Sequence, residues 1–526
     1  MESMRKFSCL AFSFVFLPIL SANAAEKNSL TIYSTVAPGS LPPSLYRPSV
    51  GVGAWANGNQ VPGYATIREE REITLKSGAN DIKFTDVPAL IDPTTVTFKS
   101  LTDPTGTSVV EQDYHFDLVS SQKLLERYLG QDITVDQVQG TGMQNFSGKL
   151  LSAGGGGLIL QDQAGKITTI NNYADIHFPE LPGGLIVKPT LLWNVTADKP
   201  GKQTIETSYK TEGITWWADY NALYTENKNG DGGVIDLGAW VTIVNKSGAS
   251  YDEVGLKLVA GDVHQVQPEQ QSVFRAQSAL AASALATPTA GFAEKSFFEF
   301  HLYTLGRSTA IPDNSTKQIE LFPEVTHVPV EKQFVYISSS LPFYGTPMLN
   351  RDYGNQGNKK IDVYLKFKND KKAGLGIPLP AGRVRVSKQD DADGATEFIG
   401  EDVIDHTPKD EDVLIKMGEA FDIVGERKQT DFRLDNEHGV LDETFEITLS
   451  NHKDNDVNVI VKENMYRMSN WEITNSSEKY EKVDAHTVRF PVSVDKNGTT
   501  KFQYTVHYTW GVPSSPAIPP RGILPH

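Results

Sequence analysis

The chain has 526 residues, of which 65 are acidic and 49 basic, with a formal net charge of -16 and one cysteine. Its length predicts three or four domains, and 39% hydrophobic with 10% aromatic residues is too much for a disordered chain. A single cysteine excludes disulfide frameworks and Cys-ligated zinc or iron–sulfur sites. The acidic excess argues against nucleic acid as a partner, because phosphates require clustered Lys and Arg.

Residues 1–24 have the order of a secretory signal peptide. Two basic residues precede an apolar run over Phe7–Leu20, and an Ala-x-Ala site ends at Ala24. This run is shorter than the roughly 20 residues that a membrane anchor needs. Cleavage after Ala24 is therefore predicted. It removes Cys9 and leaves an exported chain without a transmembrane segment, located in the periplasm or at the cell surface.

Most of the remaining chain alternates between apolar and polar residues, as expected of β-strands with one buried face. Clear examples are Ile361–Phe367, Phe445–Leu449 and Phe502–Trp510. Turns rich in Gly, Asn and Asp, such as Asn229–Gly233, separate these runs. The pattern predicts a mainly β protein built from tandem, immunoglobulin-like β-sandwiches.

One α-helix is predicted over residues 119–130. Ser120 or Ser121 is placed to cap it, its leucines share one face, and Gly130 ends it. The short strands that follow, with a turn at Gly154–Gly157, predict a small β-barrel-like module. The helix therefore links two β-modules.

These patterns divide the chain into successive modules, one of which carries a Gln/Ala/Ser-rich insertion that is predicted to be mobile. In chain order they are an N-terminal β-module at 26–118, the helix at 119–130, a small β-module at 131–180, a β-sandwich at 185–340 with its insertion at 265–292, a C-terminal β-sandwich at 355–511, and a proline-rich tail at 513–526.

Acidic residues concentrate between Ser387 and Asp412, where ten acidic side chains accompany two basic ones. Calcium prefers several carboxylate and carbonyl oxygens on one loop, so this segment is a candidate calcium site. The pattern lacks the first and twelfth ligands of a calcium-binding loop, and solvated loops between strands are the alternative. No other cofactor is predicted. The candidate ligands are Asp390, Asp391, Asp393 and Glu397.

The sequence contains no catalytic signature. It lacks a Gly-x-Ser-x-Gly elbow and a His-Glu-x-x-His motif, and Gly154–Gly157 lacks the Lys-Ser/Thr of a phosphate loop. Asp405 and His406 form the most site-like pair, although such pairs are common by chance. Trp216 and Trp217 point to opposite faces of a strand. Either one of them is exposed and stacks on a sugar ring or anchors a partner, or adjoining modules cover both. Paired carboxylates for glycoside hydrolysis stay open, because their spacing is spatial.

Six segments together resemble a family of exported bacterial proteins of unknown function that is related to the mucoidy-inhibitor A proteins. The resemblance covers roughly residues 190–511, with a weaker match at Arg68–Leu90, and implies a bacterial, exported, β-rich protein without implying a reaction or site residues. The chain departs from the longer relatives in having a short helix and small β-module instead of a long coiled coil. The segments are Gly213–Tyr224, Leu258–Val263, Phe300–Leu305, Pro380–Val386, Phe398–Asp402 and Leu449–Lys453.

Together these features favour a non-enzymatic binding or structural scaffold of the bacterial envelope. Its expected partners are an envelope protein, a polysaccharide or further copies of itself. One alternative is a carboxylate-dependent hydrolase or lyase that acts on polysaccharide or peptide. The other is a calcium-dependent component of a surface assembly.

Overall fold

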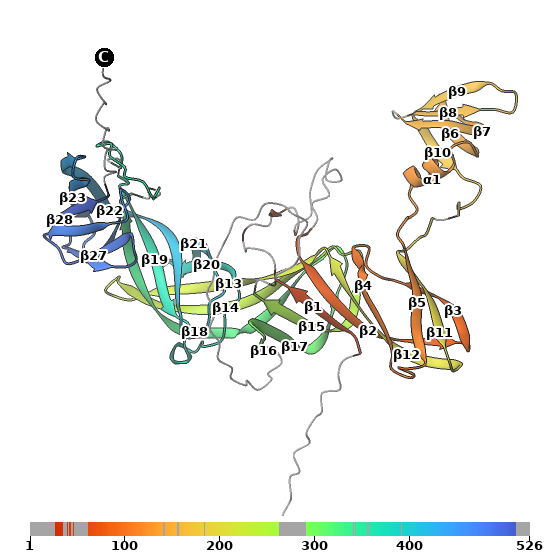
Figure 1. Cartoon of the computed structure of the whole chain (residues 1–526), viewed down its shortest axis with the longest axis horizontal. Helices are drawn as coiled ribbons and strands as arrows, with labels where there is room; N and C mark the ends of the chain where they lie inside the picture. Colours follow the sequence, from red (N-terminus) through yellow and green to blue (C-terminus); the bar gives the residue numbers. More distant parts are fainter. Residues whose placement is uncertain are drawn as a thin grey trace, which may run out of the picture.

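The computed structural model describes residues 27–34, 39, 42–43, 46, 61–139, 142–154, 157–183, 185–261, 263, 291–339, 341, 343–354, 357–390 and 392–511. The predicted signal peptide, the proline-rich tail and nearly all of the predicted insertion lie outside these residues. The described part is mainly β, with one α-helix, as the alternation of apolar and polar residues predicts (Figure 1). No helix in it is long and apolar enough to cross a membrane.

Two of the four described sheets pack together near the N-terminus. The first has seven strands, in the order β16 (Phe292–Phe297), β17 (Phe300–Ile311), β15 (Tyr251–Ala260), β1 (Ser29–Tyr33), β2 (Tyr64–Leu75), β12 (Gly201–Glu212) and β4 (Ile91–Ser100). The second has three strands, in the order β3 (Gly78–Thr85), β11 (Thr190–Ala197) and β5 (Thr107–His115).

Trp193 on β11 lies at the centre of the contact between these two sheets. It is 1% exposed, and its ring centroid lies 4.7 Å from that of Phe84 and 5.3 Å from that of Phe98. The indole Nε1 donates a hydrogen bond to Gln112 Oε1 at 2.7 Å, so the buried polar atom has a partner. This aromatic cluster closes the N-terminal sandwich.

Strands from the ranges 26–118 and 185–340 alternate within the seven-stranded sheet, so these ranges are not separate modules in space. β1 pairs in parallel with β15, and β2 pairs with β12 along its whole length. The intervening residues, which contain the helix and the small β-module, leave the three-stranded sheet after β5 and return to it at β11. The small module is therefore an insertion between two strands of the N-terminal sandwich.

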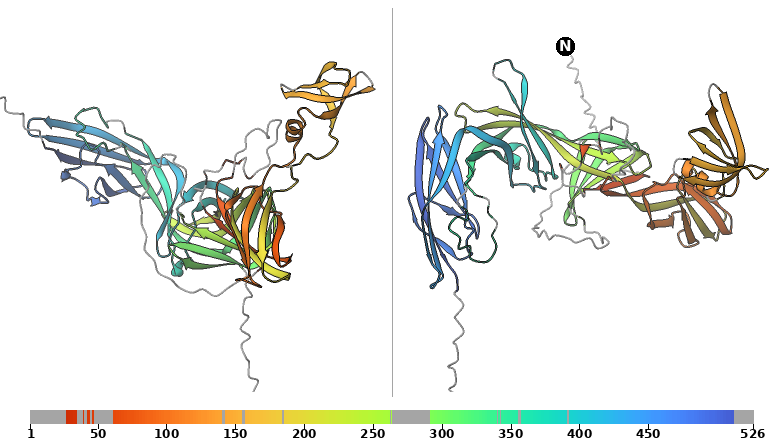
Figure 2. Two further views of the ribbon diagram at one scale, coloured as in Figure 1. Left: turned by 45° about the vertical axis from the view of Figure 1, so that its right-hand side comes forward. Right: turned by 90° about the horizontal axis from the view of Figure 1, so that it is seen from above.

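That insertion holds helix α1 (Ser121–Arg127) and a five-stranded sheet with its own core. The Ser120 side chain caps the helix by accepting a hydrogen bond from Lys123 N. A bridge between Leu118 and Ile186 marks the neck, and the module stands away from the other sheets (Figures 1 and 2). The strand order is β10 (Tyr173–His177), β6 (Asp132–Gln139), β7 (Gly142–Gly154), β8 (Gly157–Gln161) and β9 (Ile167–Asn171).

The largest sheet contains thirteen of the described strands and runs through the centre of the molecule to its C-terminal end (Figure 2). Its main path is β21 (Thr396–Ile404), β20 (Gly382–Gln389), β13 (Ile214–Glu226), β14 (Gly232–Asn245), β18 (Ser315–Ile337), β19 (Lys360–Lys368), β22 (Asp412–Asp435), β23 (Val440–Asn451), β28 (Thr499–Thr509) and β25 (Trp471–Ser476). The remaining strands are β24 (Val457–Asn464), β27 (Thr487–Val494) and β26 (Glu481–Lys482), and a 3-10 turn covers Lys371–Ala373.

Two long strands connect the central part of this sheet to the C-terminal sandwich. β18 has 23 residues; its first part pairs with β14, and its last part pairs with both β19 and β24. β22 has 24 residues and pairs first with β19 and then with β23. The predicted sandwiches 185–340 and 355–511 therefore share one continuous sheet, although a second core fills the C-terminal part.

We expect Trp193→Ala to lower the free energy of unfolding of the N-terminal sandwich by about 3–5 kcal/mol, because it leaves a large cavity between the two sheets. Urea titration followed by tryptophan fluorescence and circular dichroism measures this loss. Trp240→Ala is the matched control, since Trp240 is 40% exposed and its truncation leaves no buried cavity. Equal losses in the two variants would contradict the placement of Trp193 at the centre of the sandwich.

Candidate functional site

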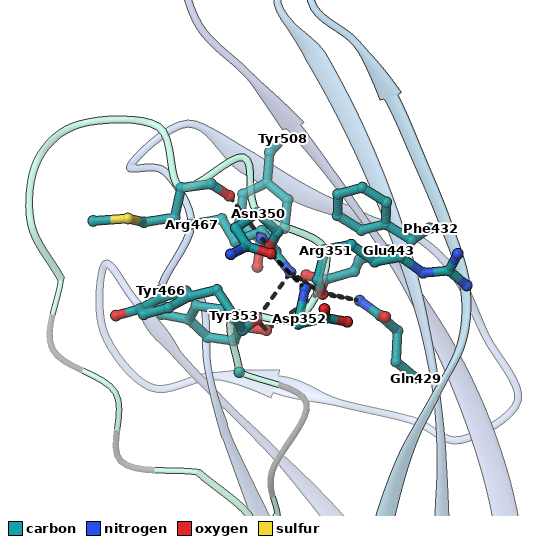
Figure 3. Close-up of polar contacts among 12 residues, drawn as sticks. Asn350, Arg351, Asp352, Tyr353, Gln429, Phe432, Glu443, Tyr466, Arg467 and Tyr508 are labelled. Carbon is teal, nitrogen blue, oxygen red and sulfur yellow. Dashed lines mark hydrogen bonds and ion pairs between the residues drawn. The ribbon is translucent and has the colours of Figure 1, made fainter.

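Four charged side chains lie inside the C-terminal sandwich, close to the irregular segment 343–354. Figure 3 shows two of them, Glu443 and Arg467, beside residues 350–353 of that segment. Arg427 comes from β22, Glu443 from β23, Glu463 from β24, and Arg467 from the connection between β24 and β25. Their exposed fractions are 6%, 0%, 1% and 1%. Buried charges are rare unless they are paired, so this group, called the buried charge cluster below, has a specific role.

Arg467 binds the backbone of the irregular segment. Its guanidinium donates hydrogen bonds to the carbonyl oxygens of Met348 at 2.6 Å, Asn350 at 2.8 Å and Tyr353 at 3.0 Å. It also donates to Glu443 Oε1 at 2.6 Å. The planar fork of an arginine matches several acceptors at once, which explains why one side chain holds a segment that lacks regular strand pairing.

Glu443 supplies the negative charge that offsets the cost of burying the Arg467 guanidinium. Its Oε1 also accepts hydrogen bonds from Gln429 Nε2 at 2.7 Å and from the Tyr466 hydroxyl at 3.3 Å. Burial lowers the pKa of Arg467, but the hydrogen bond and charge of Glu443 outweigh burial, so the pKa lies above its ordinary value. The guanidinium therefore stays charged inside the sandwich.

Arg427 and Glu463 form the second pair of the cluster. Arg427 Nε lies 3.0 Å from Glu463 Oε2, and another of its nitrogens donates to the Gly354 carbonyl at 2.7 Å. Glu463 also accepts hydrogen bonds from Ser338 Oγ at 2.5 Å and from the Tyr504 hydroxyl at 2.6 Å. The two arginines thus hold both ends of the stretch from Met348 to Gly354.

Gly354 lets this stretch pass close to the sheet. Its φ is +84°, and an added Cβ would collide with the ring and hydroxyl of Tyr466. Only glycine meets both requirements without strain. The close approach brings the Gly354 carbonyl within reach of Arg427.

The buried charge cluster is suited to hold structure and not to catalyse a reaction. Hydrolysis requires a carboxylate that reaches both substrate and water. Glu443 and Glu463 are closed off from solvent and each contacts an arginine. The cluster therefore acts as a clamp on segment 348–354.

The sequence contains a local signal that predicts part of this cluster. On β23 every second residue points inward, and Glu443 lies in phase with Leu441, Phe445 and Ile447. On β24, Glu463 lies in phase with the inward-facing valines. A glutamate at an inward position predicts a buried basic partner, although the alternation alone does not say which arginine it is.

The predicted calcium ligands lie in and after the turn that joins β20 to β21. Asp390 Oδ1 accepts a hydrogen bond from Ala392 N, and Asp393 Oδ1 accepts one from Ala395 N. Glu397 is exposed on β21, and Asp391 lies outside the described residues. In the described part of the chain, no three His, Cys, Asp or Glu side chains converge as metal ligands. Calcium binding stays a prediction, while Asp390 and Asp393 act as turn residues.

Both tryptophans of the predicted pair are buried, Trp216 at 0% and Trp217 at 6% exposure. Trp216 faces the core near Tyr303, and Trp217 Nε1 donates to Asp219 Oδ2 at 2.8 Å. Neither ring is free to stack on a sugar. The local pair at Asp405 is equally structural, because its carboxylate accepts the backbone N–H of the next residue.

A hollow of about 520 Å³ opens between β4 and β5, where the two sheets of the N-terminal sandwich diverge. Val96, Phe98 and Val109 form its apolar side, and it contains one amine and one carboxylate, those of Lys99 and Glu111. Glycoside hydrolysis by paired carboxylates requires a second acid at this place. The hollow thus has the size of a ligand site without that catalytic pair.

No family model, curated protein or solved structure matches this chain. The resemblance to the family related to the mucoidy-inhibitor A proteins accordingly stays a prediction from the sequence.

We expect Arg467→Met to lower the free energy of unfolding of the C-terminal sandwich by about 3–5 kcal/mol, because it leaves the Glu443 carboxylate buried without its cation. Denaturant titration measures the change. Arg433→Met is the control, since the pair of Arg433 with Asp431 is exposed and contributes less than about 1 kcal/mol. If Arg433→Met costs as much as Arg467→Met, the clamp assignment is wrong.

Stability should also fall at alkaline pH. Burial, with the nearby charge of Glu443, raises the pKa of Tyr466 to about 12, above the ordinary value near 10. The unfolded chain therefore ionises first, and the free energy of unfolding declines between pH 10 and 12. We expect Tyr466→Phe to remove about 2–3 kcal/mol of this decline, measured by denaturant titration at several pH values. Tyr480→Phe, at an exposed position, should keep the wild-type profile.

Proposed function

We propose that the chain is an exported protein of the bacterial envelope that acts as a non-enzymatic scaffold or binding protein. The observation that supports it best is the continuous sheet built around β18 and β22, which joins the central and C-terminal cores. Strands that run through both cores resist bending, because movement of one core relative to the other would break hydrogen bonds along those strands. Such a body suits the holding of partners at fixed separation.

The distribution of charged groups supports the same proposal. The two most buried carboxylates are engaged by arginines, and the hollow between β4 and β5 holds a single carboxylate. Neither arrangement favours the hydrolase alternative. For the calcium-dependent alternative, the described residues contain no group of three or more His, Cys, Asp or Glu side chains that could hold a metal ion. An envelope protein, a polysaccharide or a second copy of the chain is the proposed partner.

We expect the full chain, expressed in a bacterium with a periplasm, to be recovered from the osmotic-shock fraction with Ala25 as its first residue. N-terminal sequencing and in-cell crosslinking measure cleavage and partner contact. Ala24→Asp should block cleavage, because the signal site requires small residues. Recovery of the uncleaved chain from the cytoplasm would overturn the export proposal, and turnover of a polysaccharide that is lost in Glu111→Gln would overturn the non-enzymatic one.

A further inference from the structure

An aromatic surface lies at one end of the C-terminal sandwich, directly before the clamped stretch. It consists of Phe343, Tyr344, Trp471, Lys482 and His486 and is called the aromatic ledge below. The rings of Phe343 and His486 stack at 4.4 Å, and Lys482 Nζ lies 4.4 Å above the Trp471 ring. Trp471 Nε1 donates to the Ala485 carbonyl, which links the two halves of the ledge.

The ledge is accessible and held in place. Phe343 and Tyr344 are 38% and 59% exposed. The residues from Met348 to Gly354, which come a few positions later, are fixed by Arg467 and Arg427. Figure 3 shows Arg467 beside residues 350–353. Side chains that are ordered before binding lose less conformational entropy when a ligand arrives. The stacking of Phe343 on His486 and the clamp on the following stretch therefore limit the movement of this surface before a ligand binds.

The end of β28 brings the C-terminal tail to the ledge. Trp471 lies opposite Tyr508 in the sheet register, and Thr509 N donates to the Asn470 carbonyl. The described residues end at Gly511, three positions after the residue that faces Trp471. The described part of the chain thus ends a few residues from the strand pair that carries Trp471.

The composition of the tail fits this surface. It contains five prolines among 14 residues, and in polyproline II form, at about 3.1 Å per residue, it reaches roughly 43 Å. Aromatic-lined surfaces bind such segments because the segment loses little entropy on binding. The tail carries Arg521 and no acidic residue, whereas the stretch 471–486 carries four acidic residues and two lysines. The stretch therefore has a net excess of two acidic residues, which favours the arginine of the tail.

We propose that the aromatic ledge is a binding site for a proline-rich polyproline II segment, and that the chain's own tail at 513–526 occupies it within the same molecule. The short connection gives the tail a high effective concentration at the ledge. The inference concerns an intramolecular contact and does not depend on the proposed envelope function.

The test uses a fluorescein-labelled peptide with the sequence of residues 513–526 and two forms of the protein, the full chain and a chain that ends at Gly511. The truncated chain retains every described strand. We expect the peptide to bind the truncated chain at least tenfold more tightly than the full chain, because the tail competes in the latter. Equal binding to both forms, or binding to neither, overturns the proposal.

Variants locate the site. Tyr344→Ala in the truncated chain should weaken peptide binding at least tenfold, whereas Phe421→Ala should leave it unchanged, since Phe421 is 95% exposed on β22 outside the ledge. Equal loss in both variants overturns the assignment. Circular dichroism melting checks that each variant is folded.

The intact chain gives an independent test that does not depend on truncation. Trypsin cleaves after Arg521, and we expect this cleavage to be at least fivefold faster in Tyr344→Ala than in the wild type or in Phe421→Ala. Equal rates in all three overturn the proposal. Light scattering that shows a dimer, which becomes a monomer on truncation, also overturns it, because the tail then occupies the ledge of a second copy.

Discussion

Glu443 and Glu463 place two carboxylates inside the C-terminal sandwich, where a charge without a partner costs several kcal/mol. Each is therefore tied to an arginine, and each arginine is tied to carbonyl oxygens of the stretch from Met348 to Gly354. The strands and this stretch form one unit: removal of any member leaves a buried charge or a buried carbonyl without its partner. Apolar contacts alone do not impose such a condition.

The same constraint extends beyond the sandwich through its strands. Arg427 lies on β22, whose first residues pair with β19, and Ser338 follows the end of β18. Both long strands contribute to the central sheet as well as to the C-terminal one. The orientation of the two cores is thus tied to the geometry of the clamp, because all of these groups are fixed to the same continuous strands.

Local patterns in the sequence predict the secondary structure of this protein well. Alternation identifies strands such as β23 and β28, and Ser120 marks the start of α1. The pairing of distant strands is not visible in such patterns: β1 pairs with β15, far along the chain, and local alternation does not say which strand will be its neighbour. For this reason the sequence indicates a mainly β fold but not the sharing of sheets between the predicted modules.

The candidate sites differ in the same way. The high density of acidic residues predicts a calcium site that includes Asp390 and Asp393, but in the structure these carboxylates accept hydrogen bonds from the backbone of their own turn. A single glutamate such as Glu443 does not stand out in the composition, but its position among the inward-facing residues of β23 is strong evidence that it is buried. A strand cannot turn one residue outward without turning its neighbours too. A charged residue at an inward-facing strand position therefore indicates a structural site better than a cluster of charged residues in a loop does.

The irregular stretch itself explains why the clamp uses arginine. Carbonyl groups outside regular pairing need donors when they are buried, and apolar side chains offer none. A guanidinium has five donors in a rigid plane, so Arg467 serves four carbonyls and a carboxylate together. The stretch from Met348 to Gly354 thus requires charged partners inside the sandwich, whereas Phe343 and Tyr344, which precede it in the chain, are exposed. The binding that we propose at the aromatic ledge thus lies next in the chain to a stretch whose carbonyl groups are hydrogen-bonded inside the sandwich.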